Sequence, residues 1–205
     1  LYLKEEIEEA IISVPAYFHD KQRVATKQAG IPAGVTVKRI INEPSAAALA
    51  SYFHAQQEQI YLIFDFGGGT FDISIVECFD TMVEILSVSG DNHLGGDDFH
   101  EIMVEAFLAE HGLIRNAVTD KEYAVLLRRA EICKQRLTAE TAARMSAVIA
   151  GRTYQSEFTN RRLMDESAVI LGKIKKVMGR ALEDSGLAMR DIDVVVMVGG
   201  SSKMP

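Results

Sequence analysis

The sequence predicts an α/β protein on three observations. Residues 11–51 alternate strand, helix, strand and helix, a succession typical of a sheet that helices cover. Residues 60–88 hold three apolar strand-like runs, and a last apolar run, 194–198, opens into a Gly-Gly-Ser-Ser turn. Residues 95–168 are helical and charged instead, and we expect them to form an inserted subdomain.

Proline and glycine mark the ends of the elements in the first part of the chain. Pro15 stops the first strand and keeps the preceding residue extended, and Gly30 ends the helix that follows. Pro44 suits the first turn of the next helix. The glutamate-rich residues 3–9 are expected to form a solvated helix face. The expected elements are strand 11–14, helix 20–29, strand 35–41 and helix 44–51.

Three strands and a largely helical part follow. The short connections between strands 60–66, 71–78 and 82–88 favour antiparallel pairing. Asp98, with Glu101 three residues later, suits a helix N-cap with a capping box. The remaining expected elements are helices 99–111, 120–137 and 163–185, a hairpin over 145–158 and strand 194–198.

Composition and charge exclude several classes of function. The 205 residues are 48% hydrophobic and 25% charged, which is ordinary for a globular chain. A net charge of −7 argues against a nucleic-acid binder, and no apolar run is long enough to span a membrane. Cys78 and Cys133 are far apart and are expected to be reduced core residues. The five histidines show no metal-binding spacing, so we expect them in surface or packing positions.

The most informative segment is residues 60–77, in which three glycines separate two strand-like runs. Glycines at a hairpin tip let backbone N–H groups approach phosphate oxygens, and nearby carboxylates hold Mg²⁺ directly or through water. The alternative is a glycine-rich turn without a ligand. No G-x-x-x-x-G-K-[ST] sequence occurs, so this is not a Walker A loop. The segment predicts a metal–nucleotide phosphate loop built from Asp65, Gly67, Gly68, Gly69, Thr70 and Asp72.

Two further segments carry polar groups in suggestive positions. Glu131, Lys134, Gln135 and Thr138 share one face of the helix 120–137, beside an apolar stripe. Glu131 can accept hydrogen bonds from ribose hydroxyls and Lys134 and Thr138 can donate to them, although spacing alone favours a solvated face with a Glu–Lys pair. The turn after strand 194–198 is a second ligand-facing candidate, for which a plain strand-end loop is the simpler reading.

Together these motifs resemble the DnaK-type heat-shock chaperone family, specifically its ATPase domain. The matching stretches occur in the family's order along the whole chain. They are Val14–Phe18, Ile41–Ala48, Asp65–Asp72, Gly90–Gly96, Glu131–Leu137 and Val198–Ser201.

The resemblance implies the actin-like ATPase fold, with its ribonuclease-H-like motif, in which two lobes surround a nucleotide cleft. The chain would supply only part of it, with an inserted helical and β-hairpin subdomain. The implied divisions are residues 1–54 in the first lobe, 55–94 and 169–205 in the inner part of the second lobe, and 95–168 in its outer subdomain.

The resemblance also implies roles for individual residues, with ATP or ADP and Mg²⁺ as cofactors. Catalytic roles fall on Glu43, Asp65, Thr70 and Asp72, of which Asp65 and Asp72 hold Mg²⁺, mainly through water. Nucleotide contacts fall on Gly67, Gly68, Gly69, Thr70, Gly96, Glu131, Lys134, Gln135, Thr138, Gly199, Gly200, Ser201 and Lys203. Pro15 and Arg23 resemble the pair that relays nucleotide state to the substrate-binding domain.

The family's partners follow from the same resemblance. A J-domain co-chaperone would bind near Arg39 and Asn42, and a nucleotide-exchange factor would bind the outer subdomain. Unfolded polypeptide would bind only through a domain outside this chain. Neither nucleic acid nor membrane is an expected partner, and the expected location is the cytoplasm.

Two residues depart from the family's pattern. Gln135 and Lys203 stand where many members have arginines that sandwich the adenine, and neither stacks on a ring as a guanidinium does. We therefore expect altered adenine affinity and a divergent, HscC-like member of the family.

The ends of the chain, which has no initial Met and stops at Pro205, predict a fragment. The family's first phosphate loop and catalytic lysine would precede residue 1, so we expect the fragment to be inactive alone while its parent is an ATPase.

The alternatives on the same fold are an actin-like assembly protein and a sugar or acetate kinase. The stretches Asn42–Ala48 and Gly90–Gly96 favour the chaperone.

Overall fold

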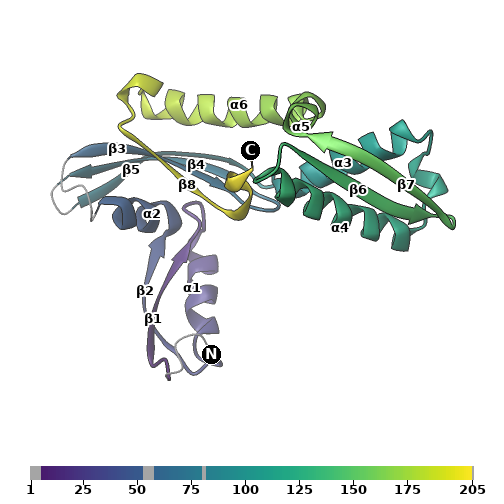
Figure 1. The fold of residues 1–205 in the computed structure, drawn as a ribbon. Helices are drawn as coiled ribbons and strands as arrows, with labels where there is room; N and C mark the ends of the chain where they lie inside the picture. Colours follow the sequence, from purple (N-terminus) through teal and green to yellow (C-terminus); the bar gives the residue numbers. More distant parts are fainter. Residues whose placement is uncertain (1–5, 53–57, 80–81, 205) are drawn as a thin grey trace. The chain divides into compact units, whose positions relative to one another are not determined.

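A computed structural model describes residues 6–52, 58–79 and 82–204, which form two compact units. The first unit comprises Leu1–Ile63, Ile73–Ser89 and Ala181–Val196, and the second comprises Phe64–Asp72, Gly90–Arg180 and Met197–Pro205. The α/β class predicted from the sequence is confirmed, because strands and helices mix in both (Figure 1).

The described strands form three sheets. β1 (Glu9–Val14) and β2 (Thr36–Asn42) pair in parallel, with Val14 opposite Asn42. β6 (Ala142–Ile149) and β7 (Arg152–Thr159) form an antiparallel hairpin. The third sheet has the order β5-β4-β3-β8, built from β3 (Gln59–Phe66), β4 (Phe71–Phe79), β5 (Met82–Asp91) and β8 (Val194–Val198).

In the first unit, each helix follows a strand of the parallel pair. α1 (Asp20–Ala29) begins after His19, whose ring accepts a hydrogen bond from the backbone N–H of Gln22 at 3.4 Å. α2 (Glu43–Tyr52) begins directly after β2. The helix expected over residues 3–9 is wrong where the structure describes it: residues 6–8 have no regular structure, and Glu9 already begins β1.

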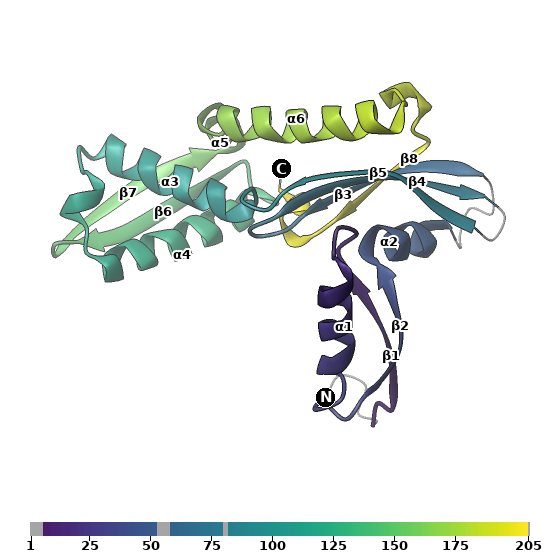
Figure 2. The same cartoon turned by 180° about the vertical axis from the view of Figure 1, so that it is seen from behind.

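The second unit places two helices beside the β6–β7 hairpin. α4 (Asp120–Leu137) packs against β6 and against α3 (Gly96–Glu110), as both views show (Figures 1 and 2). The apolar stripe predicted on α4 is buried in this core, at Leu126, Ala130, Cys133 and Leu137.

Both cysteines are free and buried, in agreement with the predicted core positions. Burial raises the pKa of the Cys133 thiol to about 11, and it also raises the pKa of Cys78. Such thiols stay protonated at neutral pH and are poor nucleophiles.

Two predictions about the helices of this part are wrong. The helix expected over 163–185 is two helices, α5 (Asn160–Glu166) and α6 (Ala168–Ser185), separated at the buried Ser167. Asp98 is not an N-cap: α3 already begins at Gly96, and the Asp98 carboxylate accepts from the Gly95 N–H at 2.7 Å. The acid therefore caps from inside the first turn of the helix.

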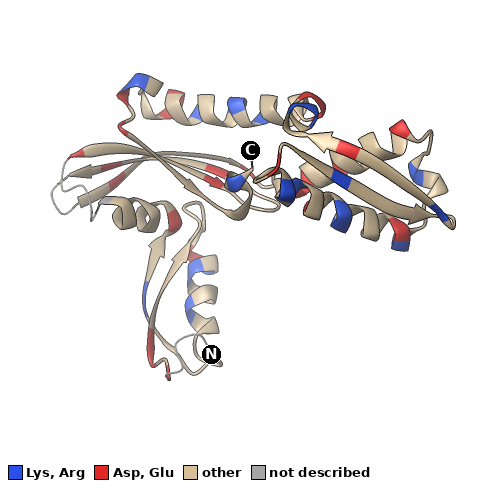
Figure 3. Ribbon diagram, viewed as in Figure 1, with Lys and Arg blue, Asp and Glu red and all other residues tan. Residues whose placement is uncertain are grey.

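Basic residues lie along α6, and α4 carries residues of both signs (Figure 3). Lys173, Lys175 and Lys176 on α6 are exposed. None of the helices in the described parts of the chain is both long enough and apolar enough to cross a membrane.

The start of α4 allows a stability prediction. The Thr119 hydroxyl oxygen accepts from the Glu122 N–H at 3.3 Å, and the Glu122 carboxylate accepts from the Thr119 N–H at 2.9 Å. We expect Thr119→Ala to lower the free energy of unfolding by about 1 kcal/mol, the usual cost of a lost N-cap. Urea denaturation measures the change, with exposed Thr141→Ala as control. Equal midpoints for the two variants would contradict a capping role for Thr119.

Candidate functional site

The glycine tip between β3 and β4 is held by backbone hydrogen bonds. The Gly67 N–H donates to the Thr70 carbonyl at 3.0 Å, which closes the turn. The Gly96 N–H donates to the Gly67 carbonyl at 3.0 Å, and the Asp97 N–H donates to the Gly68 carbonyl at 2.7 Å. The predicted phosphate loop and the N-terminus of α3 therefore lie against each other, although about 30 residues of sequence separate them.

This contact depends on a glycine at position 95. A Cβ atom added to Gly95 would lie 2.2 Å from the Gly68 carbonyl oxygen and 2.6 Å from the Gly69 nitrogen. Both atoms are backbone, so no rotamer change relieves the clash. The motif Gly90–Gly96 contains this glycine. The close contact with the backbone of Gly68 and Gly69 explains why position 95 requires glycine.

The two predicted metal carboxylates flank the same tip. A Cβ atom on Gly199 would lie 2.9 Å from Asp65 Oδ1, and one on Gly90 would lie 2.2 Å from Asp72 Oδ1. Burial raises the pKa of the Asp65 carboxyl, because its charge is poorly solvated there. A nearby cation would compensate this charge.

The carboxylate oxygens beside the glycine tip are of the ligand type that Mg²⁺ prefers. Among the residues that the structure describes, no group of three or more His, Cys, Asp or Glu could hold a metal ion. Mg²⁺ prefers oxygen ligands and keeps several of its waters, so one or two carboxylates and phosphate oxygens suffice. Asp65 and Asp72 supply such oxygens.

A cavity of about 520 Å³ in the second unit brings three distant segments together. The glycine tip, α4 and the turn after β8 all contribute to its lining. The predicted nucleotide-binding residues that line it are Gly68, Glu131, Lys134, Gln135, Thr138, Gly200, Ser201 and Lys203.

Lys134 is buried in the wall of this cavity, with only 6% of its surface exposed. Its ammonium donates to the Gly96 carbonyl at 2.8 Å. Burial lowers the pKa of Lys134, and the charges of Asp97 and Glu131 oppose that shift. Spacing alone predicts that Lys134 lies on a solvated face. In the structure its side chain is buried and its ammonium is held by the Gly96 carbonyl.

His100 and Asp97 also line the cavity, and neither is among the site residues predicted from the sequence. His100 Nδ1 lies 3.3 Å from Asp97 Oδ1. Burial, and then the charge of Lys134, lower the pKa of His100, against the opposing charges of Asp97 and Glu131. The ring is therefore neutral at pH 7. Position 100 lies one turn after Gly96 on α3, and this spacing is the sequence signal that could have identified it.

The carboxylate of Glu131 is held by its own helix. Oε2 pairs with Arg128 Nη1 at 2.5 Å, and Oε1 accepts from Gln135 Nε2 at 3.2 Å. Thr138 follows the last residue of α4 and caps it through its backbone N–H.

The turn after β8 is set by Gly199, whose φ is +86°. This is the left-handed region, which favours glycine. The Ser202 hydroxyl donates to the Gly199 carbonyl at 2.7 Å. Ser201 is buried, and a Cβ atom on Gly96 would lie 2.0 Å from its hydroxyl oxygen. Gly96 thus leaves room for both Ser201 and the Lys134 ammonium.

The remaining predicted residues belong to the first unit. Arg23 donates to the carbonyls of Ala16 at 3.2 Å and Phe18 at 2.9 Å, and to Asn42 Oδ1 at 2.7 Å. These bonds tie the turn that begins at Pro15 to the end of β2.

Glu43 and Arg39 are close in sequence to Asn42, the residue that Arg23 contacts. Glu43 is the first residue of α2 and is partly buried, whereas Arg39 is exposed on β2. They belong to the first unit, whereas the residues of the 520 Å³ cavity belong to the second.

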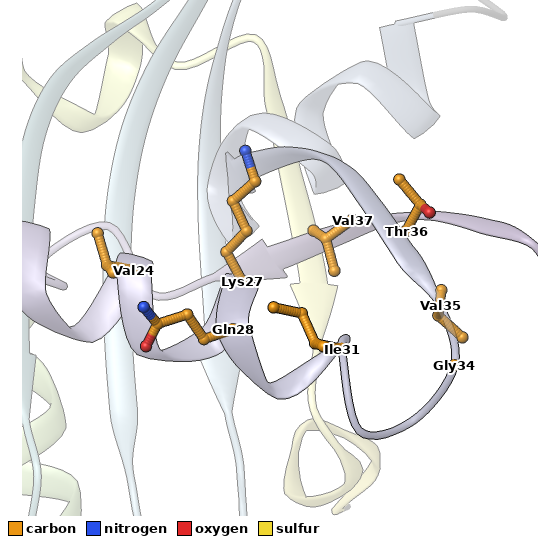
Figure 4. Close-up of a pocket in the computed structure, with 8 residues that line it drawn as sticks. All are labelled: Val24, Lys27, Gln28, Ile31, Gly34, Val35, Thr36 and Val37. Carbon is orange, nitrogen blue, oxygen red and sulfur yellow. The ribbon is translucent and has the colours of Figure 1, made fainter.

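A cavity of about 540 Å³ also lies in the first unit, between α1 and β2. Figure 4 shows the apolar side chains of Val24, Ile31 and Val37 in its lining, together with Lys27. No residue predicted for nucleotide binding lines it, so it is not part of the candidate site.

Comparison with known proteins agrees with the motifs. Residues 1–205 match the family described as "Hsp70 protein". The sequence is 40% identical over 213 residues to the "Chaperone protein dnaK" of Cyanophora paradoxa, covering 100% of this chain and 34% of that protein. The chain thus spans about a third of the length of this relative. These matches confirm the resemblance predicted from the motifs and do not favour the filament or kinase alternatives. The chain belongs to the Hsp70 family.

Proposed function

We propose that this chain binds ATP or ADP with Mg²⁺ as part of the ATPase domain of a DnaK-type chaperone. Proteins of the Hsp70 family bind these nucleotides with Mg²⁺. One observation carries the proposal: three segments that are distant in the sequence, and that the family resemblance assigns to nucleotide binding, line a single cavity of about 520 Å³.

In the proposed arrangement adenosine lies against α4 and the turn after β8. Glu131 accepts hydrogen bonds from ribose hydroxyls, while Lys134 and Thr138 donate. The base lies near Gln135 and Lys203. Their side chains stack on a ring less well than arginine does, which lowers the affinity for adenine. Gly199, Gly200 and Ser201 support the adenosine and the α-phosphate.

The phosphates point toward the glycine tip. Backbone N–H groups of Gly67, Gly68 and Gly69, with Thr70, contact the β- and γ-phosphates. When bound, Mg²⁺ neutralises phosphate charge, and Asp65 and Asp72 hold it there mainly through water. Gly96 keeps the cavity open beside Lys134.

The activity of the whole protein is a further proposal, because the chain spans about a third of its relative. In the longer protein, hydrolysis of ATP, with Glu43 ordering metal and water, drives cycles of unfolded-polypeptide binding and release. Pro15 and Arg23 relay the nucleotide state. The division into residues 1–54, 55–94, 95–168 and 169–205 stays a prediction, as does the cytoplasmic location.

Family members work with J-domain co-chaperones and nucleotide-exchange factors. For this chain we propose that the J-domain contacts the region of Arg39 and Asn42. Arg39 is exposed there and accessible to an acidic partner surface. The proposed exchange-factor surface is the outer subdomain.

Titration calorimetry with Mg²⁺-ADP tests the nucleotide site. We expect measurable binding, weakened about tenfold by Glu131→Ala through loss of hydrogen bonds to a charged acceptor. Exposed Glu157→Ala is the matched control and is expected to bind like the wild type. Absence of binding to a chain that circular dichroism shows to be folded would contradict the proposal. Equal affinities of Glu131→Ala and Glu157→Ala would remove adenosine from α4.

A further inference from the structure

The carboxylate of Glu131 is bracketed by two side chains of its own helix. Arg128, one turn before it, pairs with Oε2 at 2.5 Å, and Gln135, one turn after it, donates to Oε1 at 3.2 Å. Glu131 lines the 520 Å³ cavity together with Gln135, whereas Arg128 does not. Arg128 thus lies outside the cavity lining and contacts a residue that belongs to it, Glu131.

The contacts with Arg128 and Gln135 restrict where the Glu131 carboxylate can point. A glutamate on an open helix face samples several rotamers, and a ligand must then pay for ordering it. Here each oxygen already has one partner on the helix side, and a carboxylate oxygen accepts more than one hydrogen bond. The lone pairs that face the cavity stay available to hydroxyl donors of a ligand.

The pair itself contributes little to folding. The side chain of Arg128 is 66% exposed and that of Glu131 is 33% exposed. An exposed ion pair of this kind is weak, and an arginine placed before a glutamate has the less favourable orientation along a helix. Its contribution to ligand binding can therefore be measured without a large change in stability.

We propose that Arg128 is a positioning residue of the ribose subsite, which acts by holding the Glu131 carboxylate toward the cavity. The inference rests on the proposed nucleotide function and adds a residue that touches no ligand. Because it acts through a contact with ribose hydroxyls, its effect depends on those hydroxyls being present. A general attraction of Arg128 for phosphate would not depend on them.

The test compares Mg²⁺-ADP with its 2′,3′-dideoxy analogue in calorimetric titrations of the full chain. We expect Arg128→Ala to weaken ADP binding roughly three- to fivefold, the size of one exposed charged contact, and to change the analogue's affinity less than twofold. Arg128→Lys keeps the charge and is expected to recover part of the loss. Arg129→Ala, the adjacent exposed arginine, is the control and should leave both affinities unchanged.

The outcomes separate the two proposals. If the folded wild type binds neither ligand, the nucleotide function is overturned and this inference with it. If the wild type prefers ADP to the analogue and Arg128→Ala keeps that preference, only the positioning role is overturned. Equal weakening of both ligands, or tighter ADP binding by the variant, also overturns it.

Discussion

Replacing Gly95 by alanine is expected to destabilise the second unit by about 3 kcal/mol and to abolish nucleotide binding. The new Cβ atom would lie 2.2 Å from the carbonyl oxygen and 2.5 Å from the carbonyl carbon of Gly68. Relief requires the start of α3 to move away from the glycine tip. That movement breaks the backbone bonds from Gly96 to Gly67 and from Asp97 to Gly68. Urea denaturation and titration with Mg²⁺-ADP measure the two effects.

The matched control is the same substitution at Gly179, an exposed helical position of α6. A Cβ atom there meets nothing within 4 Å. Alanine should raise the free energy of unfolding by about 0.5–1 kcal/mol, because glycine is a poor helix former. If Gly95→Ala has the denaturation midpoint of the wild type, the glycine tip and the start of α3 do not pack against each other as described.

Local signals explain which elements were predicted well. The predicted bounds of α4 match the structure because Thr119 and Glu122 form a capping box and an apolar stripe repeats along the helix. The hairpin around Gly151 is equally clear from a glycine between two strand-like runs, and in the structure this glycine has a φ of +75°. In both cases a few neighbouring residues determine the element.

The errors arose where distant residues decide the structure. The sequence pattern of residues 163–185 predicts one helix, but the helix is interrupted at Ser167, which is fully buried. The start of α3 was placed too late, because Gly96 and Asp97 begin the helix while donating to Gly67 and Gly68. The burial of Ser167 and the contact of α3 with the glycine tip have no local signature.

The candidate site shows the same limit. The glycine tip and the face of α4 were recognisable, since each motif is contiguous or follows helical spacing. That Lys134 is buried and bonded to Gly96 could not be predicted from spacing, which favoured a solvated face. His100 was missed because its environment comes from α4 as well as from its own helix.

Removing the charge of Lys134 is the second large expected effect. Lys134→Met keeps most of the side-chain volume and removes an ammonium that lies beside the cavity. We expect the affinity for Mg²⁺-ADP to fall at least tenfold, about 1.4 kcal/mol, because the ribose hydroxyls lose a charged hydrogen-bond donor.

Stability should change much less than affinity in this variant. The bond to the Gly96 carbonyl at 2.8 Å is lost, but the cost of burying a charge disappears with it. The expected change in the free energy of unfolding is within about 1 kcal/mol, since these two effects oppose each other. Lys176→Met, at an exposed position of α6, controls for the change in net charge.

The pattern of the two measurements distinguishes a ligand-binding lysine from a structural one. If Lys134 serves only to hold Gly96 and the start of α3, the methionine variant should be strongly destabilised while its folded fraction still binds ADP normally. If Lys134 contacts nucleotide, the variant should remain folded and lose affinity both for ADP and for adenosine, which lacks phosphate. Loss confined to ADP would instead move the lysine's contact from the ribose to the phosphates.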